Sequence, residues 1–246
     1  MKKQLGVSIS EVLISLFLTS LITTLLMQFY LSSKRHYVEA EELLSQSFDL
    51  SWVGDLMSDS IRRAGFTPCL GINQLSVNDR RANGGLIQAL RIGNQGQLIQ
   101  INRMNEQFAK VINMQSATRV IVSHPPLFNK KHPLLIADCD HAEVQQIVSI
   151  ESQADKKVIT FAKPLQYIYN ASAYVGEFLE ERWFIKKNSR GEETLHYQLT
   201  QTEEITSLIH TLKIQNEKVN DRQFIKVIMG LDEDKTHTIR VAVRGT

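Results

Sequence analysis

The chain has 246 residues, of which 43% are hydrophobic and 22% charged, and its mean hydropathy is −0.17. This ordinary globular mixture excludes a disordered or collagen-like chain and a polytopic membrane protein. The net charge is only +2, and the 28 basic and 26 acidic residues are spread along the chain, so we predict no direct nucleic-acid binding. Two cysteines are too few for a four-cysteine zinc site.

The N-terminal region contains a segment long enough to cross a membrane. After Lys2, Lys3 and Glu11, 22 residues from Val12 to Ser33 carry no charge. As a helix they would extend about 33 Å, which matches the hydrocarbon core of a bilayer. The run is longer than the apolar region of about 7–15 residues in a signal peptide, and no small-x-small cleavage site follows it. A membrane helix is favoured over a secretory signal peptide, and a plain single-pass anchor is the alternative.

Glu11 is the residue that a plain anchor does not explain. A carboxylate at the start of an apolar helix must be paired, protonated or held at the membrane interface. It is therefore a candidate functional residue.

This region resembles the leader and first helix of type IV pilin-like proteins, in which a basic leader ends in glycine, an apolar residue follows, and a glutamate stands fifth. The matching positions are Gly6, Val7 and Glu11; Val7 replaces the usual phenylalanine and Ser10 the usual aliphatic residue. The resemblance implies a leader over 1–6 that prepilin peptidase cleaves between Gly6 and Val7, with the Val7 amine as a site of N-methylation. It also implies that Glu11 pairs with the amine of an adjacent subunit during assembly.

Beyond Lys34 the pattern becomes amphipathic, and no proline occurs before Pro68. We predict one helix over 7–63, with residues 7–33 in the membrane or filament core and residues 34–63 packed on a globular body. The apolar residues near helical spacing are Leu43, Leu50, Val53, Met57 and Ile61, with an adjacent row of Leu44, Phe48, Trp52 and Leu56.

Residues 64–246 contain short extended segments separated by turns such as Asn83-Gly84-Gly85. Candidate strands lie at 86–92, 97–101, 119–123, 134–137, 143–150, 158–161, 181–186, 195–199 and 239–243, and 205–214 is compatible with a helix or a strand. In 143–150 we expect Val144, Val148 and Ile150 to share one face. The predicted fold class is α+β: the long N-terminal helix packed on a mainly antiparallel sheet in a single body.

Two further segments are similar to the minor pilin family of the type IV pilus-assembly protein PilW. They are SIRRAGFTPC at 60–69 and DCDHAEV at 138–144. Lys2 and Lys3 favour a cytoplasmic leader, which places the body beyond the inner membrane, where thiols can be oxidised. We therefore expect a disulfide between Cys69 and Cys139, with two separate buried thiols as the alternative.

Other candidate sites lack the spacing that their chemistry needs. The acidic runs at 232–234 and at Asp138 and Asp140 do not alternate oxygen ligands around a glycine as a calcium loop does. The seven histidines form no zinc motif, and no nucleotide-binding or nucleophile-elbow motif occurs. Lys186, Lys187 and Arg190 are typical of a solvated hairpin. We predict no catalytic residue, no metal site and no cofactor.

The resemblance implies a minor pilin that helps initiate or assemble a type IV pilus. It would be a single-pass inner-membrane protein with a periplasmic body that enters the filament, for instance at its tip. The implied partners are other minor pilins, the major pilin, prepilin peptidase, the inner-membrane assembly platform and the bilayer. One alternative is a minor pseudopilin of the J type in a type II secretion system. The alternative from a different class is an anchored periplasmic enzyme or sensor.

Overall fold

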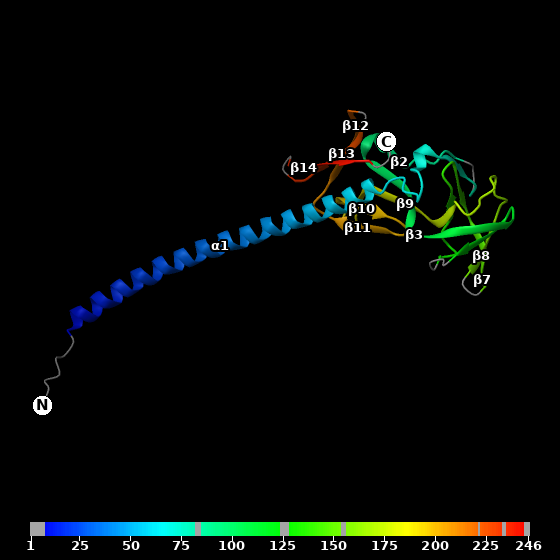
Figure 1. Ribbon diagram of the computed structural model, residues 1–246. Helices are drawn as coiled ribbons and strands as arrows, with labels where there is room; N and C mark the ends of the chain where they lie inside the picture. Colours follow the sequence, from blue (N-terminus) through cyan, green and yellow to red (C-terminus); the bar gives the residue numbers. More distant parts are fainter. Residues whose placement is uncertain are drawn as a thin grey trace. The chain divides into compact units, whose positions relative to one another are not determined.

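The computed structural model describes residues 8–81, 85–123, 128–153, 156–220, 222–232 and 235–243 (Figure 1). The predicted leader, Val7 and the predicted turn residues Asn83 and Gly84 lie outside the described residues. The chain divides into two compact units, Met1–Asp49 and Leu50–Thr246, which are described separately. The long N-terminal helix and the mainly antiparallel body confirm the predicted α+β class.

The elements follow one another as a helix and then a series of strands with two short 3₁₀ turns. In chain order they are α1 (Ile9–Arg62), η1 (Ile72–Gln74), β1 (Ser76–Asp79), β2 (Leu90–Gly93), η2 (Asn94–Gly96), β3 (Leu98–Ser116), β4 (Arg119–Ser123), β5 (Leu134–Ala137), β6 (His141–Gln145), β7 (Ile147–Gln153), β8 (Lys156–Phe161), β9 (Tyr174–Lys187), β10 (Glu193–Gln198), β11 (Thr202–Thr206), β12 (Thr211–Val219), β13 (Arg222–Gly230) and β14 (Thr236–Ala242).

The helix α1 is continuous from Ile9 to Arg62, and a glycine lies three residues beyond its end. Gly65 adopts a left-handed backbone conformation with φ of +72°, and the Phe66 N–H donates to the carbonyl oxygen of Arg63. Glycine is favoured at such a position because it has no Cβ to clash. Over its described part, the predicted helix over 7–63 therefore agrees with the structure to within one residue at each end.

The strands of the larger sheet close into a ring. Their order is β1-β6-β5-β9-β3-β4-β8-β7, with β2 added to β3 and with β10, which carries β11, added to β9. Only Gln146 separates β6 from β7, so these two strands are successive parts of one extended segment. Because β6 pairs with β5 and β7 pairs with β8, hydrogen bonding runs around β5, β9, β3, β4, β8 and back to this segment. Among the described strands, the β1–β6 pair is parallel and the other pairs are antiparallel.

The interior of this ring is a separate hydrophobic core. Its apolar residues include Val111, Val122, Leu134, Ile136, Ile159, Phe161 and Val175. Glu143 lies opposite Ile136 in the β5–β6 ladder and is fully buried. Burial of a carboxylate requires hydrogen-bond donors, which a later loop supplies as described below.

A second core lies where the end of α1 meets both sheets. Val53, Met57 and Ile61 are fully buried there, together with Ile99 and Trp183 of the large sheet. The three-stranded sheet β12-β13-β14 contributes Leu212, Ile214, Ile225, Val227, Met229 and Val241. Figure 1 shows this sheet and the β7–β8 hairpin on opposite sides of the body. The four-residue spacing of Val53, Met57 and Ile61 thus predicted the packing of the last turns of α1 correctly.

Several sequence-based assignments differ from the structure. Leu43, predicted on the packed face, is exposed, and contact with the core begins at Leu50. The predicted strand 143–150 is interrupted at Gln146, so Val144 is buried while Val148 on β7 is exposed. The ambiguous segment 205–214 contains the end of β11, a bend, and the start of β12. These differences arise because pairing, and not only local periodicity, decides which side chain faces the core.

We expect Gly65→Ala to destabilise the body by about 2–4 kcal/mol, because a non-glycine residue is strained at this φ and the new methyl would overpack. The added Cβ would lie 2.6 Å from the Cβ of Ala89. The matched control is Gly54→Ala on α1, whose Cβ would lie 3.5 Å from Ile239 at ordinary contact distance. Its stability should be unchanged or raised by up to about 1 kcal/mol. Urea unfolding of the purified protein measures both, and equal midpoints for the two variants would contradict the expectation.

Candidate functional site

Glu11 lies in the first turn of α1 and is exposed. Its Oε2 atom accepts a hydrogen bond of 3.2 Å from the Ser8 N–H, and the N–H groups of Glu11 and Val12 donate to the Ser8 carbonyl oxygen. A carboxylate here satisfies an unpaired backbone donor and interacts favourably with the positive end of the helix dipole. Gly6 and Val7, the predicted cleavage positions, lie outside the described residues.

The first part of α1 has the length and polarity of a membrane span. In the described part of the chain, α1 is the one helix long and apolar enough to cross a bilayer, and the apolar window is fully exposed. Five hydroxyl groups in the run donate to carbonyl oxygens three or four residues earlier, at 2.7–3.0 Å: Ser15, Thr19, Ser20, Thr23 and Thr24. Hydroxyl groups satisfied in this way are compatible with a lipid surrounding.

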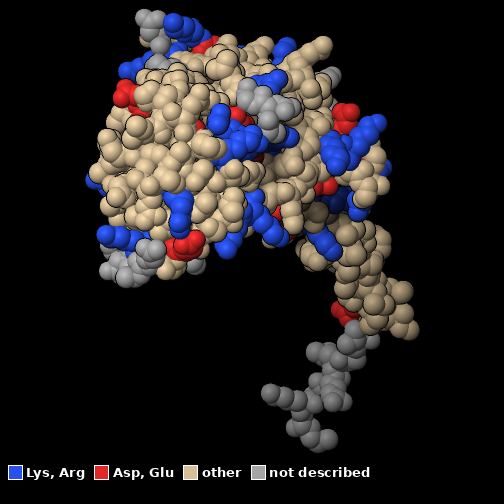
Figure 2. All heavy atoms as spheres, turned by 90° about the vertical axis from the view of Figure 1, so that its right-hand side faces the viewer, with Lys and Arg blue, Asp and Glu red and all other residues tan. Residues whose placement is uncertain are grey.

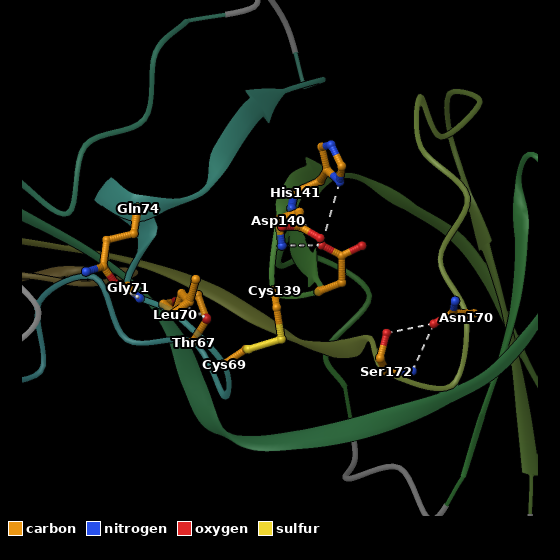
Figure 3. The surroundings of a disulfide bond; sticks show 11 residues. Thr67, Cys69, Leu70, Gly71, Gln74, Cys139, Asp140, His141, Asn170 and Ser172 are labelled. Atoms are coloured by element: carbon orange, nitrogen blue, oxygen red, sulfur yellow. Dashed lines mark hydrogen bonds and ion pairs between the residues drawn. A yellow bond between two sulfur atoms is a disulfide. The ribbon is translucent and has the colours of Figure 1, made fainter.

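Cys69 and Cys139 form a disulfide, with their Cα atoms 5.3 Å apart (Figure 3). Cys69 lies between α1 and η1, and Cys139 lies in the turn between β5 and β6. Both cysteines are exposed. The predicted pairing is thus present, and the bond links the segment that follows α1 to a turn 70 residues later.

Side chains order the backbone on both sides of the disulfide. The Thr67 hydroxyl donates to the Leu70 carbonyl oxygen on the Cys69 side. On the Cys139 side, Oδ1 of Asp138 accepts hydrogen bonds from the N–H groups of Asp140 at 2.8 Å and His141 at 2.6 Å. Asp138 and Asp140, considered above as calcium ligands, thus belong to a turn stabilised by a carboxylate.

The loop after β8 is held by Glu143, which sequence reasoning did not single out. Oε1 of Glu143 accepts hydrogen bonds from the N–H groups of Gln166 at 2.8 Å and Tyr167 at 3.1 Å. The Tyr167 ring stacks on His141 at 4.0 Å between centroids. Burial, and then the nearby Glu143 carboxylate, raise the pKa of Tyr169 well above its usual range. No sequence signal marks this network, because its members come together only through strand pairing.

A small polar pocket of about 150 Å³ lies beside the ends of β1 and β2. Arg81 donates from Nη2 to Asp79 at 2.7 Å and from Nη1 to Glu180 at 2.6 Å, and its guanidinium lies 5.0 Å from the centre of the Phe178 ring. Burial by itself would raise the pKa of Asp79, but the hydrogen bonds and charge of Arg81 lower it overall. One arginine therefore pairs with both acids, and the cluster fits a structural ion-pair network rather than general acid–base chemistry.

The remaining sequence candidates lie apart from one another. Asp232 is exposed and accepts from His210 at 3.0 Å, whereas Glu233 and Asp234 lie outside the described residues. Among the described residues, no group of three or more His, Cys, Asp or Glu side chains is placed to hold a metal ion. Lys186 and Lys187 end β9, and Arg190 lies in the tight turn to β10, where the Asn188 side chain accepts its N–H.

The face in Figure 2 carries small separate groups of basic and acidic side chains among uncharged residues. These groups form no continuous basic surface in that view. Comparisons with protein-family models, with curated proteins and with solved structures find no match to this chain.

Proposed function

We propose that this chain is a minor pilin of a type IV pilus, processed by prepilin peptidase and acting in the initiation and assembly of the filament. The observation that carries the proposal is the position of Glu11 in the first turn of a membrane-length helix. It stands fifth after the predicted cleavage point at Gly6, and no other charge occurs between Lys3 and Lys34.

The proposed role of Glu11 follows from the cost of a buried charge. An unpaired carboxylate in an apolar filament core would cost several kcal/mol. Cleavage after Gly6 would create a positive amine on Val7, and the amine of an adjacent subunit would then pair with Glu11. Oε2 of Glu11 accepts the Ser8 N–H, while Oε1 has no hydrogen bond among the described residues and is open to such a partner. A pair of this kind would set the register between subunits.

The proposed location is the inner membrane, with the body in the periplasm and in the assembled pilus. The basic residues Lys2 and Lys3 favour a cytoplasmic leader. A structural disulfide between exposed cysteines is suited to an oxidising compartment. The proposed partners are other minor pilins, the major pilin, prepilin peptidase and the assembly platform.

We expect Glu11→Leu to be cleaved and to reside in the inner membrane, yet to be lost from pili. The substitution removes the partner of the incoming amine, although it lowers the cost of inserting the helix. The assay is complementation of a strain that lacks this protein. It scores surface pili, incorporation into sheared filaments, and the N-terminal mass of the membrane-extracted protein.

Two further variants separate charge pairing from general damage to the helix. Glu11→Gln keeps an acceptor for the amine and should be intermediate. Glu41→Leu makes the same change on α1 beyond the apolar run and should assemble normally. Normal piliation and incorporation by Glu11→Leu would refute the proposal and favour a plain anchor. An intact Met1 in peptidase-positive cells would refute the processing step.

A further inference from the structure

A groove follows one face of α1 at the end of its apolar run. It has a volume of about 460 Å³ and is lined by Gln28, Leu31, Ser32, Arg35, His36 and Glu39. All of these residues belong to the first unit of the chain. The groove differs from the apolar surface before it because five of its six side chains are polar.

The apolar run determines where the groove lies relative to the membrane. The uncharged residues end at Ser33, and Lys34 and Arg35 are the first charges after Glu11. Tyr30 and Tyr37 are both exposed on this part of the helix. Tyrosine is enriched at the headgroup level of membranes, where its ring and hydroxyl meet apolar and aqueous surroundings respectively. When residues 12–33 span the hydrocarbon core, the groove therefore crosses the boundary of one leaflet: Gln28, Leu31 and Ser32 lie on the core side, and Arg35, His36 and Glu39 lie at the level of the headgroups.

Polar side chains of the groove are available to bind a ligand. Within the described residues, the Ser32 hydroxyl and the Gln28 amide make no hydrogen bond. The hydroxyl groups earlier in the run do make such bonds, namely those of Thr19, Ser20, Thr23 and Thr24. Arg35 and Glu39 have the i,i+4 spacing of a helical ion pair. Within the same described residues, neither of them forms an ion pair or hydrogen bond.

The order of these groups along the helix matches the order of groups in a phospholipid headgroup. At 1.5 Å per residue, Ser32 stands about 6 Å beyond Gln28, Arg35 about 4.5 Å beyond Ser32, and Glu39 about 6 Å beyond Arg35. Gln28 and Ser32 are donors at the depth of the acyl esters. Arg35 and His36 are suited to a phosphate, for which arginine has matching geometry. Glu39 is an acceptor one turn further from the hydrocarbon core.

We propose that this groove binds the headgroup of phosphatidylethanolamine, a phosphate diester with a primary ammonium. Arg35 and His36 hold the phosphate, and Glu39 accepts hydrogen bonds from the ammonium. A choline headgroup has no N–H to donate, and a glycerol headgroup has no cation, so the groove discriminates among common phospholipids. The proposal rests on the membrane span of α1 and is independent of the pilus function.

The test is a lipid titration of the purified, delipidated full-length protein in detergent, followed by native mass spectrometry. The lipids are phosphatidylethanolamine, phosphatidylcholine and phosphatidylglycerol with identical acyl chains. We expect the affinity for phosphatidylethanolamine to exceed that for phosphatidylcholine by about tenfold or more, as for one charge-assisted hydrogen bond. Glu39→Gln should bring the two affinities together, while Arg35→Gln should weaken binding of all three lipids.

Matched controls come from the same part of the helix. Lys34→Gln and Glu41→Gln each remove one charge from residues that do not line the groove, and both should retain the wild-type preference. Equal wild-type affinities for phosphatidylethanolamine and phosphatidylcholine would overturn the proposal. So would tightest binding of phosphatidylglycerol, since net charge would then explain the attraction. Displacement of the lipid by millimolar soluble phosphoethanolamine would also overturn it, because the ligand would then be a free phosphate ester.

Discussion

Glu181→Ala is expected to destabilise the body by about 3–5 kcal/mol, because it leaves a buried guanidinium without its partner. Nε of Arg103 on β3 donates to Oε1 of Glu181 on β9 at 2.6 Å. The Glu181 side chain is only 2% exposed and that of Arg103 only 10%. Burial, and then the Glu181 carboxylate, raise the pKa of Tyr197 to about 12. Tyr197 packs against the apolar core that contains the end of α1, so the pair near it borders a region where water replaces the lost carboxylate poorly.

The matched control for this variant is Glu151→Ala, which breaks an ion pair on the protein surface. Glu151 accepts from Arg119 at 3.0 Å, and both side chains are well exposed at 51% and 40%. Its removal should cost no more than about 1 kcal/mol. The double variant Arg103→Met/Glu181→Leu replaces both charges with apolar groups and should recover most of the lost stability. Urea unfolding measures all three, and equal costs for Glu181→Ala and Glu151→Ala would contradict the expectation.

The second large effect is expected from removing the disulfide. Cys69 and Cys139 are 70 residues apart, so their bond restricts a long loop of the unfolded chain. In the loop-entropy model this contributes roughly 4 kcal/mol. We therefore expect Cys69→Ser/Cys139→Ser to lower the free energy of unfolding by about that amount. Membrane insertion should be unchanged, because the apolar run of α1 does not involve either cysteine.

Reduction provides an independent measurement of the same bond. Wild-type protein treated with a reductant should unfold at the denaturant concentration of the double variant, and the double variant should not respond to the reductant. Peptide mapping under non-reducing conditions should recover the fragments that contain Cys69 and Cys139 as one species. Quantitative alkylation of both cysteines without prior reduction would show that the bond is absent from the native protein.

The long helix was predictable from the sequence because its causes are local. The charge-free residues 12–33, the absence of proline before Pro68 and the glycine at Gly65 predict a membrane-length helix and its end. The strands at 119–123 and 134–137 were also predicted with the bounds of β4 and β5. Each is a short apolar segment whose limits are set by neighbouring turn residues.

Other elements depended on partners far away in the chain. The prediction placed only 97–101 and 181–186 in strands where the structure has the long strands β3 and β9. Their polar residues are held in extended conformation because the two strands pair along most of their lengths, with an irregularity between Met104 and Phe108. Periodicity within a short window does not report pairing between residues about 80 positions apart.

For the candidate site, the charge pattern along the chain was enough to single out Glu11, and the disulfide between Cys69 and Cys139 was also expected before the fold was known. The ring closed by β6 and β7, and the buried carboxyl groups of Glu143 and Glu181 with their specific donors, became evident only once the strands were seen to pair. The physical reason is that the stability of a buried polar group depends on its partner. Here the partners come from the loop after β8 and from Arg103 on β3, which chain folding alone brings within hydrogen-bond distance.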